Sequence, residues 1–202
     1  MIILKANKNN FIYLIELSRQ MQKPIIFPTD TIYGIGAEIN NIEANKFIYE
    51  AKFRKLKKSF PILIGSKSQL NMLVENTTPC QHRIINKFWP GPYTFILNAK
   101  KHLNNIYKEN GKVAVRLPNI KWLSDSLIEI DCPITATSAN ITDQPYTNNI
   151  EKIINVFKDS VPLYLYDLLN NLQASTIIDI SNEDNITFIR NPHNLLLQDI
   201  MF

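Results

Sequence analysis

The chain has 202 residues, of which 45% are hydrophobic and 20% are charged. These proportions are typical of folded globular proteins and exclude an intrinsically disordered chain. Lys and Arg exceed Asp and Glu by 22 to 18, and the resulting formal charge of +4 favours anionic partners only weakly over an ordinary lysine-rich surface. The length fits one domain over residues 1–202.

The cysteines and the N-terminal residues indicate the cellular compartment of the protein. The two cysteines, Cys80 and Cys132, have no CxxC spacing, which argues against a disulfide scaffold and a structural zinc site. The N-terminal residues carry Lys and Asn among their apolar residues and lack a signal-peptide cleavage pattern. No apolar run reaches the roughly 18 residues that span a bilayer. We therefore expect a cytoplasmic protein without membrane association.

Short apolar runs rich in β-branched residues alternate with helical patterns along the chain, which favours an α/β (α+β) fold. The patterns predict strands over residues 25–27, 61–64, 93–97, 113–117, 134–137, 163–166, 176–180 and 186–190. They predict helices over residues 10–21, 42–53, 67–74, 79–88, 120–130, 150–157 and 195–201.

The predicted helix 42–53 has one apolar face and a basic end. Its apolar residues recur at the spacing i, i+3, i+4 and i+7 of one helix face: Ala44, Phe47, Ile48 and Ala51. Lys52 and Arg54 lie at or just past its C-terminus, where cations are favoured by the helix dipole. On spacing alone, these two cations either end the helix or bind an anion.

Two polar segments are hard to explain by structure alone. Residues 28–36 follow a predicted strand with hydroxyls, a carboxylate and two glycines, at the strand edge where α/β folds usually bind ligands. Plain turn chemistry is the alternative. Residues 52–58 carry five cations, which suit either a phosphate cradle or a solvated basic loop.

Further polar residues interrupt the later strands. Arg116 lies within an apolar strand and is therefore either buried and paired or directed into a cleft. The segment 135–140 places three hydroxyls and an amide at a strand end, where they contact phosphate or carboxylate oxygens or cap the next segment. Walker A, GxSxG and HExxH motifs are absent, and the three histidines have no metal-ligand spacing.

Taken together and in this order, these segments resemble the YrdC/TsaC family of threonylcarbamoyl-AMP synthases. The family's motifs PTxTxYGL, KxR, WPGPxT, VAVRxP, SAN and STxxD correspond to residues 28–35, 52–54, 89–94, 113–118, 138–140 and 175–179, followed by Arg190 in the place of an RxG-like element. The resemblance implies an open twisted sheet flanked by helices around a basic concave cavity.

The resemblance also implies an activity and its partners. L-Threonine, CO2 or bicarbonate, and ATP would give threonylcarbamoyl-AMP and pyrophosphate. A tRNA threonylcarbamoyltransferase complex would then modify tRNAs that read codons beginning with A. ATP would enter with Mg²⁺ on its phosphates, and no protein-ligated metal is expected. Direct binding of tRNA or double-stranded RNA is a further implied property.

By motif position, the resemblance also implies residue roles. Thr31 and Arg116 would hold the threonine, with Arg116 on its carboxylate, and Thr137 would lie between the two substrates. The residues facing phosphates, carbamate or nucleotide would be Lys52, Arg54, Lys58, Ser138, Asn140 and Arg190, with Lys52 and Arg54 in the catalytic role. The serine that usually follows SAN is missing, so Tyr146 or Thr147 would replace it.

Two alternatives to the synthase stay open. One is a non-catalytic RNA-binding protein that uses the same basic cavity, and it predicts salt-sensitive RNA affinity without dependence on threonine. The other is a relative with the same fold that acts on a different carbamoyl or acyl acceptor.

Overall fold

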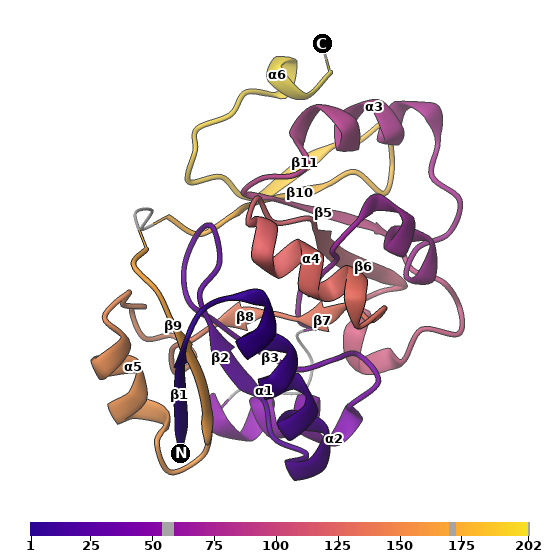
Figure 1. Cartoon of the computed structure of the whole chain (residues 1–202). Coiled ribbons are helices and arrows are strands. Elements are labelled where there is room, and N and C mark those ends of the chain that lie inside the picture. The colour runs from indigo at the N-terminus through magenta and orange to yellow at the C-terminus, as the bar shows by residue number, and fades with distance from the viewer. Residues whose placement is uncertain (54–58, 170–172, 202) are drawn as a thin grey trace.

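The computed structural model describes residues 1–53, 59–169 and 173–201, and it mixes helices with twisted sheets, so the predicted α/β (α+β) class is confirmed (Figure 1). Its strands are β1 (Ile2–Lys5), β2 (Ile25–Phe27), β3 (Gly34–Gly36), β4 (Ile62–Leu63), β5 (Tyr93–Asn98), β6 (Lys112–Arg116), β7 (Ile134–Thr135), β8 (Thr137–Ser138), β9 (Leu163–Tyr166), β10 (Thr176–Asp179) and β11 (Thr187–Arg190). Its helices are α1 (Lys8–Met21), α2 (Ile42–Ala51), α3 (Pro79–Phe88), α4 (Lys121–Glu129), α5 (Ile150–Phe157) and α6 (Leu197–Met201), with 3-10 turns η1 (Lys67–Met72) and η2 (Asn105–Tyr107).

The strands form two sheets rather than the one large sheet that was expected. The first sheet has five strands in the order β1-β9-β2-β3-β8, and the second has six in the order β11-β10-β5-β6-β4-β7. In Figure 1 the first sheet lies in the lower part of the molecule and β5, β10 and β11 lie in the upper part. Parallel and antiparallel pairs occur in both sheets.

The two sheets meet where the segment 134–138 passes from one to the other. The prediction of one continuous strand over 134–137 is wrong, because β7 pairs with β4 of the second sheet and β8 pairs with β3 of the first. Between them, the amide of Ala136 donates to Pro61 O at 2.8 Å, outside both ladders. The polar residues of this segment, Thr135, Thr137 and Ser138, therefore lie at the junction of the two sheets.

Helices cover both faces of the first sheet. Phe11, Leu14 and Ile15 of α1 and Leu123 and Leu127 of α4 form one buried cluster with alternate residues of β2 and β9. The intervening residues of these strands pack in a second cluster with α2 and α5. Because successive strand residues point to opposite faces, the continuous apolar runs of β2 and β9 are buried on both sides.

At β5 and β6, the second sheet is covered by a helix on one face. Phe95 and Leu97 of β5 and Val113 and Val115 of β6 pack in a cluster with Ile84 and Ile85 of α3. This leaves the opposite face, with the alternate residues of the same strands, directed toward the first sheet's polar loops. That face forms the floor of the cavity described below.

Local sequence explains several helix ends. The helix α3 is capped by Thr78, whose hydroxyl accepts from the Gln81 amide while the Gln81 side chain accepts from the Thr78 amide, a capping box. The helix α2 ends at Ala51, earlier than predicted, and Phe53 beyond it has a left-handed backbone with φ of 51°. The segment 67–74, predicted as a helix, forms the 3-10 turn η1 over its first six residues.

Two strands were not predicted. The strand β3 consists of Gly34, Ile35 and Gly36, and glycine has a low strand propensity. It forms because β2 and β8 pair with it on both sides. The strand β1 is a short edge strand that pairs only with β9 among the described strands. The assignment of residues 1–202 to one domain stays a prediction.

The two cysteines differ in access, and this predicts different reactivity. Cys132 is 4% exposed, and burial raises the pKa of its thiol to about 11, whereas Cys80 is partly exposed on α3. Because the thiolate is the reactive species, we expect iodoacetamide at pH 8 to alkylate Cys80 first. Cys132 should react only after unfolding, which peptide mass spectrometry would detect. Equal rates in the native protein would contradict this prediction.

Within the described part of the chain, none of the helices combines the length and the apolar character needed to cross a membrane.

Candidate functional site

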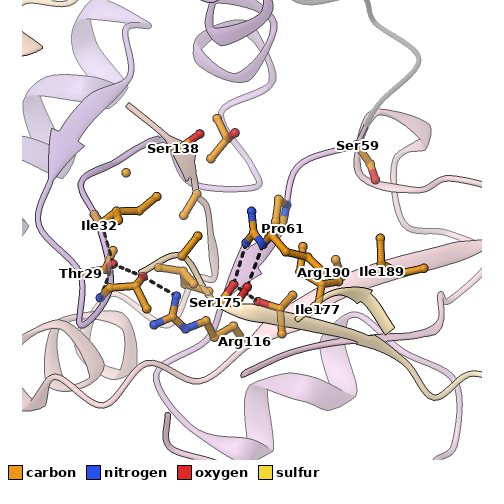
Figure 2. Close-up of a pocket in the computed structure, with 18 of the residues that line it drawn as sticks. Thr29, Ile32, Ser59, Pro61, Arg116, Ser138, Ser175, Ile177, Ile189 and Arg190 are labelled. Carbon is orange, nitrogen blue, oxygen red and sulfur yellow. Dashed lines mark hydrogen bonds between the residues drawn. The ribbon is translucent and has the colours of Figure 1, made fainter. Parts of the chain in front are cut away.

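A cavity of about 480 Å³ lies between the second sheet and the loops of the first. Figure 2 shows the side chains that converge on it from both sides. Its walls come from the loop after β2, the β7–β8 crossing, the segment before β4, and the strands β5, β6, β10 and β11. The cavity therefore brings together most of the motif segments that were singled out in the sequence.

The floor follows from strand alternation. Ala114 and Arg116 of β6 line the cavity, whereas Val113 and Val115 on the same strand face the core. The same alternation places Thr94 and Ile96 of β5, and Ile177 of β10, on the floor. Arg116 is thus directed into the cavity by its position in the apolar strand β6.

Arg116 is both buried and paired, and it also lines the cavity. Its residue is 5% exposed, and its guanidinium forms an ion pair with the carboxylate of Asp30. Nη1 donates to Thr31 Oγ1 at 2.9 Å, and Nε donates to Gly91 O at 3.1 Å. Asp30 Oδ2 in turn accepts from the Asn119 amide at 2.9 Å, so the guanidinium is held in one orientation from three sides.

A second arginine reaches the cavity from β11. Arg190 donates through Nε to Ser175 O at 2.8 Å and through Nη2 to Ser175 Oγ at 3.1 Å (Figure 2). Ser175 Oγ also lies 2.9 Å from Thr94 Oγ1, and both of these residues are buried. The guanidinium of Arg190 therefore lies on the strand pair β10–β11. Among the described residues, its hydrogen bonds go to neutral groups only.

The two guanidiniums both line the cavity, and their positive charges repel each other. Partial burial lowers the pKa of Arg190, and the positive charge of Arg116 lowers it further. The carboxylate of Asp30 balances the charge of Arg116, whereas the hydrogen bonds of Arg190 within the described part of the chain go to neutral groups. An anion placed between the two groups would relieve this repulsion, and charge-assisted bonds from arginine suit carboxylate and phosphate oxygens.

The β7–β8 crossing supplies the opposite wall. Ala136, Thr137 and Ser138 line the cavity, and Ser138 Oγ donates to Asn140 Oδ1 at 2.5 Å. Lys52 is 2% exposed, and its Nζ donates to Ser138 O at 2.5 Å and to the backbone and side-chain oxygens of Asn140. The buried ammonium of Lys52 therefore fixes the Ser138–Asn140 loop through that loop's own oxygen atoms.

The predicted site residues are thus partly assembled. Thr31, Arg116, Thr137, Ser138 and Arg190 line one cavity. Lys52 and Asn140 contact Ser138 instead of lining the described cavity wall. Tyr146 is exposed and also lies outside that lining. Arg54 and Lys58 lie outside the described residues. The roles assigned to all ten residues stay predictions.

Sequence reasoning gave no individual role to several residues that shape the cavity. Asp30 and Thr29 lie in the 28–36 segment, and Ser175 lies in the STxxD-like segment. The sequence predicted a site at both segments but no role for these three side chains. Asp30 fixes Arg116, and Ser175 fixes Arg190. The available signal was a carboxylate beside the predicted ligand residue Thr31, which a buried arginine would require as a partner.

The described residues contain no group of three His, Cys, Asp or Glu side chains that could hold a metal ion. Glu109 is the carboxylate that reaches the cavity rim among the described lining residues. The expectation that no metal is bound by the protein stays a prediction.

Among the described residues, the hydrogen bonds of Arg190 go to neutral groups, and we therefore predict that anions stabilise the protein through Arg190. We expect millimolar pyrophosphate to raise the melting temperature of the wild type by a few degrees, because binding to the native state alone stabilises it. Arg190→Ala should abolish the shift. Arg83→Ala is the matched control, since Arg83 is exposed on α3 and lies outside the cavity lining, and it should leave the shift intact. An equal shift in Arg190→Ala, measured by differential scanning fluorimetry, would contradict the assignment.

The fold and the cavity define a mixed α/β protein with an arginine-lined cavity between two sheets. A family model of the Sua5/YciO/YrdC family, described as "Telomere recombination", matches residues 19–191. The chain belongs to this family.

Relatives and solved structures agree with this membership. The chain is 30% identical over 181 residues to the threonylcarbamoyl-AMP synthase of Pyrococcus abyssi, covering 88% of this chain and 52% of that protein. It is 34% identical over 131 residues to the threonylcarbamoyl-AMP synthase of Bacillus subtilis, covering 64% of this chain and 38% of that protein. The chain thus spans about half or less of these two relatives. With the corresponding Blochmanniella pennsylvanica protein, the identity is 27%, covering 83% of this chain and 87% of that protein.

Among solved structures, P. abyssi Sua5 complexed with L-threonine superimposes with a TM-score of 0.87 at 28% identity, covering 99% of this chain and 60% of that chain. Escherichia coli YciO gives a TM-score of 0.80 at 21% identity, covering 94% of this chain and 92% of that chain, which supports the fold alone.

Proposed function

We propose that this protein is a threonylcarbamoyl-AMP synthase, which forms L-threonylcarbamoyladenylate and pyrophosphate from L-threonine, CO2 or bicarbonate, and ATP. The observation that carries the proposal is one cavity lined by two guanidiniums, those of Arg116 and Arg190, together with the hydroxyl groups of Thr31, Thr137 and Ser138. Relatives named for this activity, and a neighbour solved with L-threonine, support it.

The threonine would occupy the side of the cavity near Arg116. Its carboxylate would accept from the guanidinium, whose orientation is held by Asp30 and Gly91 O. Thr31, which is 2% exposed and lies beside Nη1, would contact the same substrate. The amine would then be directed toward the centre of the cavity, near Thr137.

The nucleotide would occupy the side of Arg190 and Ser138. Arg190 would donate to phosphate oxygens, and Ser138 and Asn140 would contact the nucleotide from the β7–β8 crossing. Lys52 would act on the same loop, because its ammonium holds the carbonyl oxygens of Ser138 and Asn140. Arg54, Lys58 and Tyr146 are proposed for the phosphates and the nucleotide by motif position alone.

The chemistry needs no protein nucleophile. The neutral amine of threonine forms a bond to the carbon of CO2, and its proton leaves to solvent. An oxygen of the resulting carbamate attacks the α-phosphorus of ATP, and the bond from that phosphorus to the bridging oxygen breaks, releasing pyrophosphate. Positioning of the two substrates and neutralisation of charge on the phosphates supply the catalysis. Mg²⁺ enters with the nucleotide as part of the MgATP substrate.

The product would serve tRNA modification in the cytoplasm. A mixed anhydride of a carbamate and a phosphate is a reactive acyl donor, so a transferase complex must consume it to modify tRNAs that read codons beginning with A. Direct contact of this chain with tRNA or double-stranded RNA is a further part of the proposal.

Pyrophosphate release tests the function directly. The purified protein is incubated with ATP, Mg²⁺ and bicarbonate, and L-threonine is compared with L-serine, L-valine and no amino acid. Strong dependence on threonine supports the synthase. Release without threonine would indicate a different acceptor, and salt-sensitive RNA binding without any release would favour the non-catalytic alternative.

A further inference from the structure

Four groups beside the threonine side of the cavity form one chain of hydrogen bonds. Arg116 Nη1 donates to Thr31 Oγ1 at 2.9 Å, Thr31 Oγ1 lies 2.9 Å from Thr29 Oγ1, and Thr29 Oγ1 lies 2.7 Å from Ile32 O. Figure 2 shows these bonds as a continuous line of dashes. Thr29 and Thr31 are 4% and 2% exposed, so water contributes little to this chain.

The direction of each bond follows from chemistry. A carbonyl oxygen has no proton, so the single hydroxyl proton of Thr29 is donated to Ile32 O. Thr29 Oγ1 must then accept in its bond with Thr31, and the proton of that bond belongs to Thr31. The guanidinium can only donate, so Thr31 Oγ1 accepts from Arg116. The backbone amide of Thr31 also donates to Thr29 Oγ1, at 3.2 Å, which fills its second lone pair.

Thr31 consequently offers one polarity to the cavity. A hydroxyl has one proton and two lone pairs. Its proton is used on Thr29 and one lone pair is used on Arg116, so the group can only accept from a ligand. Arg116, next to it, can only donate. The pair therefore recognises a ligand that places a hydrogen-bond acceptor or anion on Arg116 and a hydrogen-bond donor on Thr31.

We propose that Thr29 is a positioning residue that fixes the proton of the Thr31 hydroxyl, so that Thr31 selects an amino acid whose side-chain hydroxyl donates a hydrogen bond. This inference rests on the proposed function, because it assigns the selected group to the threonine substrate. The amine cannot be the selected group through the reaction, since it must face the CO2 carbon and then the nucleotide. The side-chain hydroxyl does not react and is free to donate to Thr31.

The test compares two ligands that differ in this proton. L-Threonine has a hydroxyl that can donate, whereas O-methyl-L-threonine has an ether oxygen that can only accept. Titration calorimetry with the purified chain gives the ratio of their dissociation constants. In the wild type the ether should bind roughly tenfold to a hundredfold more weakly, because it leaves the Thr31 lone pair without a donor and carries an extra methyl group.

Two variants separate the proton from the methyl group. Thr29→Val keeps the shape of the side chain and removes the acceptor for the Thr31 proton, so that this proton can turn toward the ether oxygen. The ratio of dissociation constants should fall by about tenfold in this variant, while the steric effect of the methyl group stays the same. Thr29→Ser keeps the hydroxyl and should keep the wild-type ratio within about twofold.

The results distinguish the role of Thr29 from the proposed synthase activity. A wild-type ratio near one, or an unchanged ratio in a folded Thr29→Val protein, would overturn the role of Thr29 even if threonine drives pyrophosphate release. Selective binding of threonine that Thr29→Val relaxes, without pyrophosphate release by the wild type, would retain the role of Thr29 and reject the synthase. No binding of threonine would reject both. If Thr29→Val does not fold, Thr29→Ala, which also removes the acceptor for the Thr31 proton, takes its place with the same expected fall in the ratio.

Discussion

Replacing Arg116 by Ala should reduce kcat/KM for L-threonine on the order of 100-fold while changing the KM for ATP much less. The guanidinium is 5% exposed and would make charge-assisted bonds to the threonine carboxylate, which contribute about 1.5–3 kcal/mol. Pyrophosphate release at varied threonine and at varied ATP measures the two effects separately. Equal losses for the two substrates would contradict the assignment of Arg116 to threonine.

The same substitution should also destabilise the protein, and a second substitution separates the two effects. Without Arg116, the carboxylate of Asp30, whose side chain is 12% exposed, loses its ion pair, at a cost of about 3 kcal/mol in the free energy of unfolding. Adding Asp30→Ala removes the buried charge and should restore part of the stability, as urea unfolding would show. Threonine use should remain low in the double variant, because the guanidinium is still missing.

Replacing Gly36 by Ala should lower the free energy of unfolding by about 4 kcal/mol, enough to unfold a marginally stable protein. A Cβ on Gly36 would lie 1.7 Å from Thr135 O, a backbone atom at the junction of the two sheets. Thr135 cannot retreat easily, since its amide and hydroxyl bond to Ala37 and its hydroxyl also bonds to Asn45. Circular dichroism during urea unfolding measures the effect.

Gly34→Ala is the matched control on the same strand. A Cβ at Gly34 would have its nearest heavy atoms at 3.6 Å, which is ordinary van der Waals contact. We expect this variant to unfold at nearly the wild-type urea concentration. Similar losses in the two variants would mean that β3 tolerates no side chain at either position, and that the approach of Thr135 O to Gly36 does not explain the effect.

The amino-acid sequence by itself determined the class of fold, most of the elements and the segments of the site. Helices 79–88 and 150–157 and strands 25–27 and 163–166 have the predicted bounds, because apolar spacing and capping residues are local signals. Buried polar residues in apolar strands, such as Arg116, were also visible, because strand alternation assigns them to a face.

Tertiary structure decided how these parts meet. The segment 134–138 divides between two sheets, and Gly34 to Gly36 form a strand, because partner strands outweigh local propensity. The carboxylate of Asp30 meets Arg116 across 86 positions, and Lys52 turns to the Ser138–Asn140 loop although its place at a helix end also suited an anion. Such pairings depend on distances between elements that are remote in sequence, and residue spacing carries no information on those distances.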